Sequence, residues 1–200
     1  MSVSAADIKL LREQTGAGFL DCRKALEEND GDMEKAITFL REKGLTDAEK
    51  RSGRETGNGR LELYDHGDGR VGVMVEVNCE TDFVARTDEF RTFTHEIALQ
   101  IAAASPRWIL EEDVPEDILL DLKDIARKRA AEEGKQENVI DRIVDGRIQK
   151  FLDENCLMRQ PYIRDEDKSI GELVKEMIAN TGENIAIRRF ERWEVGEETA

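Results

Sequence analysis

Residues 1–44 carry apolar positions at helical spacing, divided by clear stop signals. Ser4 and Asp7 are spaced as a capping box, which predicts the start of a first helix. Asp32 is placed to cap a third helix, and Gly44 is interpreted as the end of that helix. The apolar positions of the second and third helices are Phe19, Cys22, Leu26, Met33, Ala36, Ile37 and Leu40. The pattern predicts a three-helix module.

The pattern changes after this module. Residues 45–59 are rich in charge and have no apolar period, so we interpret them as an exposed linker that continues the third helix briefly at most. Alternating apolar and polar positions then predict strands over residues 61–63 and 71–77, joined by a glycine-rich turn, and residues 184–193 resemble a final strand. Together these strands predict a small antiparallel three-stranded sheet.

Helices surround this sheet in the predicted fold. An apolar stripe predicts a helix at about residues 88–104, and two helical segments at about residues 115–155 are separated by a polar stretch with a glycine. We expect these two segments to form a projecting helical hairpin. Ser169 and Glu172 predict a further helix. The predicted fold class is therefore α+β, with a core domain over residues 60–200.

Charge and composition exclude several function classes. The formal net charge is −15, which disfavours binding to nucleic acid phosphates. No stretch reaches the roughly 18 apolar residues of a membrane helix, and no signal peptide is evident, so we expect no membrane contact and a cytoplasmic location. Cys22, Cys79 and Cys156 lack paired spacing, which suits reduced thiols, although a thiol that bridges two copies stays open.

The sequence offers little catalytic chemistry. Gly67, Gly69 and Gly72 spell GxGxxG, but strands are predicted on both sides, so a tight hairpin turn is favoured over a dinucleotide loop. A second set of residues, Cys79, Glu80, Asp82 and His95, has no metal-ligand spacing. No phosphate loop or nucleophile arrangement is present. We expect no metal site, no cofactor, no catalytic residues and no enzyme activity.

Two stretches of sequence resemble a known family. Residues 15–26, Thr-Gly-Ala-Gly-Phe-Leu-Asp-Cys-Arg-Lys-Ala-Leu, and residues 77–86, Val-Asn-Cys-Glu-Thr-Asp-Phe-Val-Ala-Arg, are similar to two signatures of elongation factor Ts. The usual first signature has two methionines where this chain has Phe19 and Leu20. The resemblance continues through Arg188-Arg189-Phe190 to Glu194-Val195-Gly196-Glu197, and it identifies a short form of the family with a single core.

The resemblance implies a guanine-nucleotide exchange factor that binds elongation factor Tu, both GDP-bound and nucleotide-free. It implies that Thr81, Asp82, Phe83 and Val84 insert beside the nucleotide and disturb the bound magnesium, so that GDP leaves and GTP then displaces the factor. The N-terminal residues that it places against the partner are Arg12, Phe19, Leu20 and Arg23.

Other interpretations stay open. Without the resemblance, Thr81 or Asp82 would cap a helix and Phe83 would fill a core. The three-helix module resembles ubiquitin-associated (UBA-like) domains, which favours an adapter or scaffold as an alternative function. An uncharacterised small enzyme is a weaker alternative. Because a single three-stranded core leaves a sheet face uncovered, we also expect a homodimer.

Overall fold

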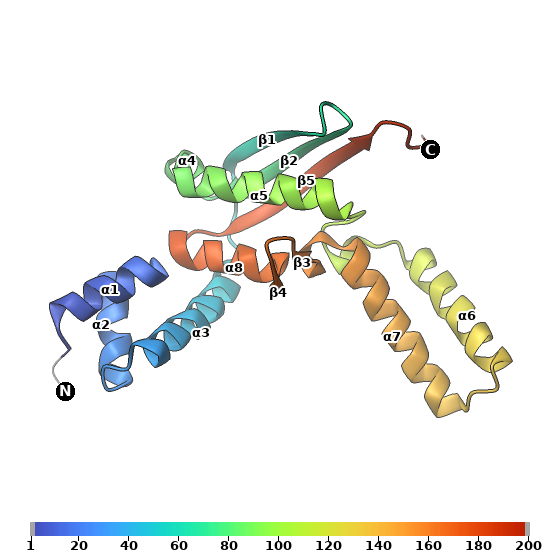
Figure 1. The fold of residues 1–200 in the computed structure, drawn as a ribbon, viewed down its shortest axis with the longest axis horizontal. Helices are drawn as coiled ribbons and strands as arrows, with labels where there is room; N and C mark the ends of the chain where they lie inside the picture. Colours follow the sequence, from blue (N-terminus) through green and yellow to red (C-terminus); the bar gives the residue numbers. More distant parts are fainter. Residues whose placement is uncertain (1–2, 199–200) are drawn as a thin grey trace. The chain divides into compact units, whose positions relative to one another are not determined.

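The computed structural model describes residues 3–198, so residues 1, 2, 199 and 200 of the predicted domain ranges lie outside the described residues. Its helices are α1 Ala5–Thr15, α2 Phe19–Glu28, α3 Met33–Arg51, α4 Asp82–Ala85, α5 Asp88–Ala104, α6 Glu116–Glu132, α7 Glu137–Asn155 and α8 Ile170–Thr181. Its strands are β1 Asn58–His66, β2 Val71–Cys79, β3 Pro161–Tyr162, β4 Asp165–Ser169 and β5 Ile185–Glu194 (Figure 1). This mixture of helices and small sheets confirms the predicted α+β class.

The chain folds into two compact units that each combine distant stretches of sequence. The first unit contains the chain up to residue 62 together with residues 75–95 and 172–188, and the second contains residues 63–74, 96–171 and the chain from residue 189. Several elements, including the three long strands, contribute residues to both units. The boundaries predicted from sequence at residues 44 and 59 stay a prediction.

Helices α1, α2 and α3, at the start of the first unit, pack around an apolar cluster of their own. The capping box is present, because the Ser4 hydroxyl accepts a hydrogen bond from the Asp7 backbone while the Asp7 side chain accepts one from the Ser4 backbone. Asp32 caps α3 as expected. The buried members of the cluster are Ile8, Leu11, Cys22, Ala25, Leu26, Ala36 and Leu40. The apolar stripes read from the sequence therefore form one core among these helices.

The third helix differs from its predicted end. Helix α3 continues through Gly44 to Arg51, so the first part of the predicted linker is helical, and β1 begins at Asn58 before that linker was expected to finish. A Cβ atom at Gly44 would lie 2.9 Å from the Cβ of Ala179 in α8. The glycine thus permits a close helix–helix approach rather than ending the helix, because any side chain there would clash.

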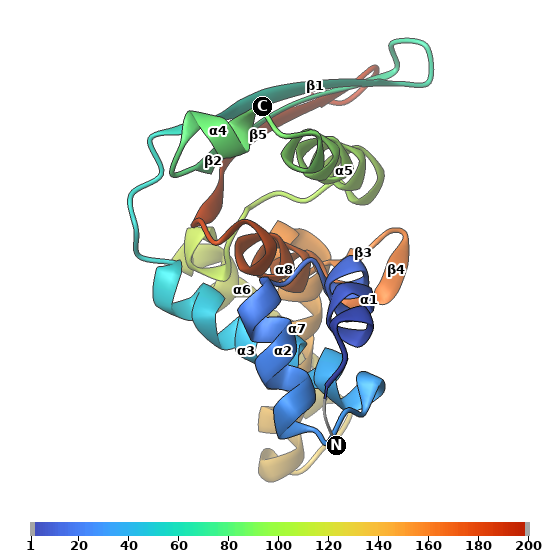
Figure 2. The same cartoon turned by 90° about the vertical axis from the view of Figure 1, so that its left-hand side faces the viewer.

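The main sheet has the strand order β1-β2-β5, with β2 in the centre. Its central strand buries alternate valines, which are Val71, Val73, Val75 and Val77. Helix α5, at the residues predicted, lies against the sheet in both units (Figure 2). In the first unit His95 of α5 contacts Glu62 of β1, and in the second Arg192 of β5 donates to the Ala102 carbonyl of α5.

The second unit contains the predicted helical hairpin, α6 and α7, which run side by side (Figure 1). Two apolar clusters lie along their seam; the buried members are Val114, Ile148, Leu152 and Cys156 in one and Ala126, Ala130, Ile140 and Val144 in the other. A short two-stranded sheet, β3 with β4, was not predicted, because its residues are mostly polar and do not alternate. No helix between residues 3 and 198 is long and apolar enough to span a membrane.

Candidate functional site

Segment 81–84, which the sequence singles out, lies directly after the central strand. Strand β2 ends at Cys79, and a single helical turn, α4, follows at Asp82–Ala85. Thr81 is the N-cap of that turn, since its hydroxyl accepts a hydrogen bond from the Val84 backbone at 3.4 Å. Thr81 therefore has the helix-capping role that its residue type predicts without the family resemblance.

The side chains of this turn point away from any core. Phe83 is 82% exposed, so the interpretation that it fills a core is wrong. The carboxylate of Asp82 is half exposed and pairs with Arg86 one turn later, at 2.9 Å. Helix α4 has no buried residue, and Val84 is only partly covered. The segment thus presents an aromatic ring and a carboxylate to the surroundings.

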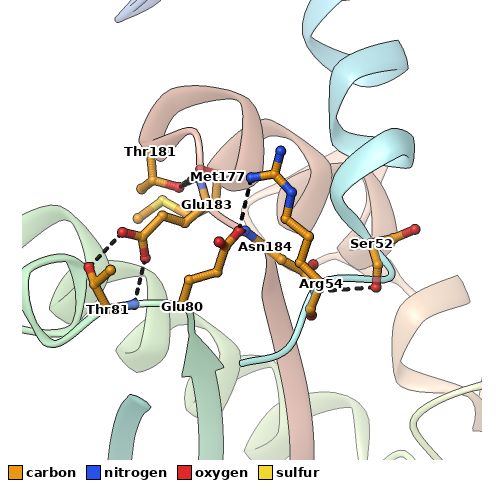
Figure 3. Close-up of polar contacts among 8 residues, drawn as sticks. All are labelled: Ser52, Arg54, Glu80, Thr81, Met177, Thr181, Glu183 and Asn184. Carbon is orange, nitrogen blue, oxygen red and sulfur yellow. Dashed lines mark hydrogen bonds and ion pairs between the residues drawn. The ribbon is translucent and has the colours of Figure 1, made fainter. Parts of the chain in front are cut away.

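A glutamate from a distant part of the chain holds this turn from behind (Figure 3). The two carboxylate oxygens of Glu183 accept hydrogen bonds from the Thr81 backbone N–H at 3.0 Å and from the Thr81 hydroxyl at 2.5 Å. Glu183 lies in the connection from α8 to β5. Because the acceptor is charged, these are among the stronger hydrogen bonds available to a protein.

The neighbouring residues form the reverse contact. Glu80 accepts a hydrogen bond from the backbone N–H of Asn184 at 2.6 Å, so each loop supplies a carboxylate to the backbone of the other (Figure 3). Asn184 is buried, and its amide donates to the carbonyl oxygens of Ser52 at 3.2 Å and Arg54 at 2.7 Å, just beyond α3. The network therefore joins segment 81–84 to the end of the three-helix module.

Cys79 completes the support of the turn. Its thiol donates to the Thr81 carbonyl at 3.1 Å, and burial, together with the charge of Glu183, raises the pKa of Cys79 to about 11. The thiol is therefore protonated near neutral pH and is neither a good nucleophile nor a good metal ligand. Within residues 3–198 no group of three or more histidine, cysteine or acidic residues is arranged to hold a metal ion. His95 instead lies 3.1 Å from a carboxylate oxygen of Glu62.

The four N-terminal site residues are all exposed. Phe19 and Leu20 occupy the first turn of α2 and are 50% and 76% exposed, while Arg12 lies in the last turn of α1. Arg23 is one turn further along α2 and pairs with Glu27 at 2.7 Å. At this exposure, neither Phe19 nor Leu20 is an ordinary core residue.

The GxGxxG stretch forms a hairpin turn, as predicted. Gly67 and Gly69 have φ angles of 64° and 85°, which favour glycine, and Asp68 between them has a φ of 54°. Asp65 accepts a hydrogen bond from the Gly69 backbone at 2.8 Å. Because β1 and β2 flank the turn, no helix N-terminus follows to bind a dinucleotide.

Comparison with known proteins agrees with the two signatures. A family model described as "Elongation factor TS" matches residues 30–197. The "Elongation factor Ts" of Caldanaerobacter subterraneus is 59% identical over 195 residues, which cover 98% of each chain. Those of Moorella thermoacetica and Coprothermobacter proteolyticus are 53% and 54% identical, over 98% of this chain and 96% and 100% of theirs.

This chain belongs to the elongation factor Ts family. It is therefore a translation elongation factor, and the resemblance read from its two short signatures is confirmed. The family match includes segment 81–84 and its supporting residues Cys79, Glu80, Glu183 and Asn184. Sequence reasoning singled out neither Glu183 nor Asn184, and it named Glu80 without its contact to Asn184, since about a hundred positions separate the two residues of each contact. The only sequence signal for Glu183 and Asn184 was that they form a polar pair where the last strand was predicted to start.

Proposed function

We propose that the chain is a guanine-nucleotide exchange factor for elongation factor Tu, and that segment 81–84 performs the exchange. The single observation that carries this proposal is the exposure of Phe83, at 82%, on a turn that is anchored by hydrogen bonds behind it. A lone exposed aromatic residue is common on protein surfaces. Phe83 supports the proposal because it lies within the second family signature and directly beside the exposed carboxylate of Asp82.

Insertion of this segment explains exchange without catalysis by the factor itself. A magnesium ion beside a bound nucleotide is held largely by phosphate oxygens and by few protein ligands. An apolar ring and a carboxylate pushed between neighbouring elements of the GTPase would displace those ligands and loosen metal and phosphate together. No covalent step and no cofactor are needed, so we propose that the chain is not an enzyme.

Thermodynamic linkage sets the order of events. If the factor weakens GDP binding by some ratio, GDP weakens binding of the factor by the same ratio. The factor therefore binds the GDP-bound form weakly and the nucleotide-free form tightly. Fresh GTP then displaces the factor and restores the active GTPase. We propose that these binding steps take place in the cytoplasm, where translation elongation occurs.

The N-terminal helices would supply affinity rather than exchange. Phe19 and Leu20 expose apolar area on the first turn of α2, with the guanidinium groups of Arg12 and Arg23 exposed on α1 and α2. Aromatic and arginine side chains are the commonest anchors of protein interfaces. We propose that these four residues bind elongation factor Tu and that the three-helix module is UBA-like.

A homodimer is the remaining part of the proposal. In the second unit, each of the three neighbouring strands exposes one large apolar side chain: Leu63 of β1, Met74 of β2 and Trp193 of β5, which are 72%, 44% and 77% exposed. A second copy of the chain would cover them with the same residues, as expected for a twofold interface.

The test is the release of fluorescent GDP from purified elongation factor Tu, followed by stopped flow. The wild-type chain should accelerate release, and replacement of Asp82 and Phe83 by alanine should remove most of the acceleration. Leu120→Ala is the matched control, because it also truncates an exposed apolar side chain, on α6. No acceleration by the wild-type chain would reject exchange and favour the adapter function.

A further inference from the structure

Helix α4 does not support its own conformation. It has four residues and buries none of them, and a single helical turn is unfavourable by itself because several dihedral angles are fixed for few hydrogen bonds. The orientation of the Asp82 and Phe83 side chains therefore depends on the contacts that hold Thr81, the N-cap residue of the turn.

Glu183 provides that hold with both of its carboxylate oxygens. One accepts from the Thr81 N–H and the other from the Thr81 hydroxyl, at 3.0 and 2.5 Å. Glu183 is itself fixed by the end of α8, since its backbone N–H donates to the Thr181 hydroxyl, which in turn donates to the Met177 carbonyl (Figure 3). The Glu183 carboxylate, two residues beyond the end of α8, is thus held against the start of the exposed turn.

The reciprocal contact restrains the same two loops a second time. The Asn184 backbone donates to Glu80, and its side chain donates to the carbonyl oxygens that follow α3. Arg54 adds an ion pair with Glu80 at 3.4 Å. A shift of Thr81 relative to Glu183 would therefore strain a network that includes buried Asn184.

We infer that Glu183 is a positioning residue for nucleotide exchange: by holding Thr81 from behind, it fixes the direction in which Asp82 and Phe83 approach the GTPase. The inference rests on the proposed function, because it assigns a role within the exchange step. Both oxygens of Glu183 are engaged with Thr81, so the residue acts through the turn and not by contact with the partner.

The test compares two substitutions of this residue with a matched control. Glu183→Ala removes both hydrogen bonds. Glu183→Gln keeps them, because its amide oxygen accepts from the Thr81 N–H and its amide group donates to the Thr81 hydroxyl, which can rotate. Glu96→Ala is the control, since the Glu96 carboxylate also accepts two short hydrogen bonds, from Tyr162 and Arg164 at 2.6 Å each, in the second unit.

The readout is the rate of GDP release from elongation factor Tu as a function of factor concentration, with the folded fraction measured by circular dichroism. We expect Glu183→Ala to lower the maximal rate about tenfold, the effect of losing a hydrogen bond to a charged group, and to change the half-saturating concentration less than about threefold. Glu183→Gln should stay within about threefold of wild type, and Glu96→Ala should keep the wild-type maximal rate per folded molecule.

A second comparison separates positioning from general stability. If Glu183 acts through Asp82 and Phe83, then Glu183→Ala should lower the maximal rate no further in a background in which both Asp82 and Phe83 are replaced by alanine. Multiplicative losses, or a loss in Glu183→Ala that only follows the folded fraction, would overturn the inference and leave the proposed function intact. Failure of the wild-type chain to accelerate release would remove both.

Discussion

Helix α4 and the α6–α7 hairpin reach stability in opposite ways. The hairpin helices have 17 and 19 residues and bury apolar side chains in two clusters along their seam. Helix α4 has four residues and buries none, and its N-cap residue Thr81 is held by the two hydrogen bonds that it donates to Glu183. An element that packs its side chains inward stabilises itself, whereas one that turns them outward needs an external anchor and keeps its side chains available for a partner.

The largest effect on stability should follow from truncation of the hairpin seam. Leu152→Ala leaves a cavity beside Ile148 and Val114, and we expect it to lower the free energy of unfolding by about 2–4 kcal/mol. Leu120→Ala removes the same atoms from an exposed position on α6 and should cost less than about 0.5 kcal/mol. Urea unfolding followed by circular dichroism measures both, and equal costs would show that the seam does not stabilise the hairpin.

A smaller effect should appear at alkaline pH near α4. Burial raises the pKa of Cys79 from 9.0 to about 11, so the folded state favours the neutral thiol. This contribution to stability is therefore complete below pH 9 and is lost as the pH rises towards 11.

Urea midpoints between pH 8 and 11 would test this contribution by comparing the wild type with Cys79→Ala. The wild type should lose more stability over that range, whereas parallel pH profiles would contradict the assigned pKa. Because Cys22, Cys79 and Cys156 are all buried, a thiol reagent at pH 8 should label the native chain slowly and the unfolded chain at all three positions. The same burial argues against a ready disulfide bridge between two copies.

Local patterns in the sequence predicted much of this fold. The apolar stripe of α5 gave its range, and the caps at Ser4 and Asp32 marked two helix starts, because these signals lie within a few residues of the elements that they define. Gly44 was misinterpreted for the opposite reason: its role depends on Ala179, far away in the sequence. A glycine that ends a helix and one that admits a neighbouring helix look the same in a single sequence.

In the candidate site, too, some residues could be predicted from local sequence and others could not. The family signature located Asp82 and Phe83, while a prediction from residue type alone would have buried Phe83. Its anchor, Glu183, could not be predicted, because no local pattern indicates which of the 45 acidic residues meets Thr81. Side chains that act on a partner can thus be found from short motifs, whereas the residues that position them require the fold.

The most direct test of the central claim compares the maximal rates of GDP release from elongation factor Tu with the wild-type chain and with Phe83→Ala. Both rates are measured at millimolar magnesium and again after a chelator has removed the magnesium. Because Phe83 is exposed, the substitution should change the free energy of unfolding by less than about 0.5 kcal/mol. At millimolar magnesium it should lower the rate about 100-fold, as loss of an interface hot spot does, and chelation should narrow that difference. An equal rate for both chains, or a difference that does not depend on magnesium, would contradict the claim that segment 81–84 acts at the magnesium site.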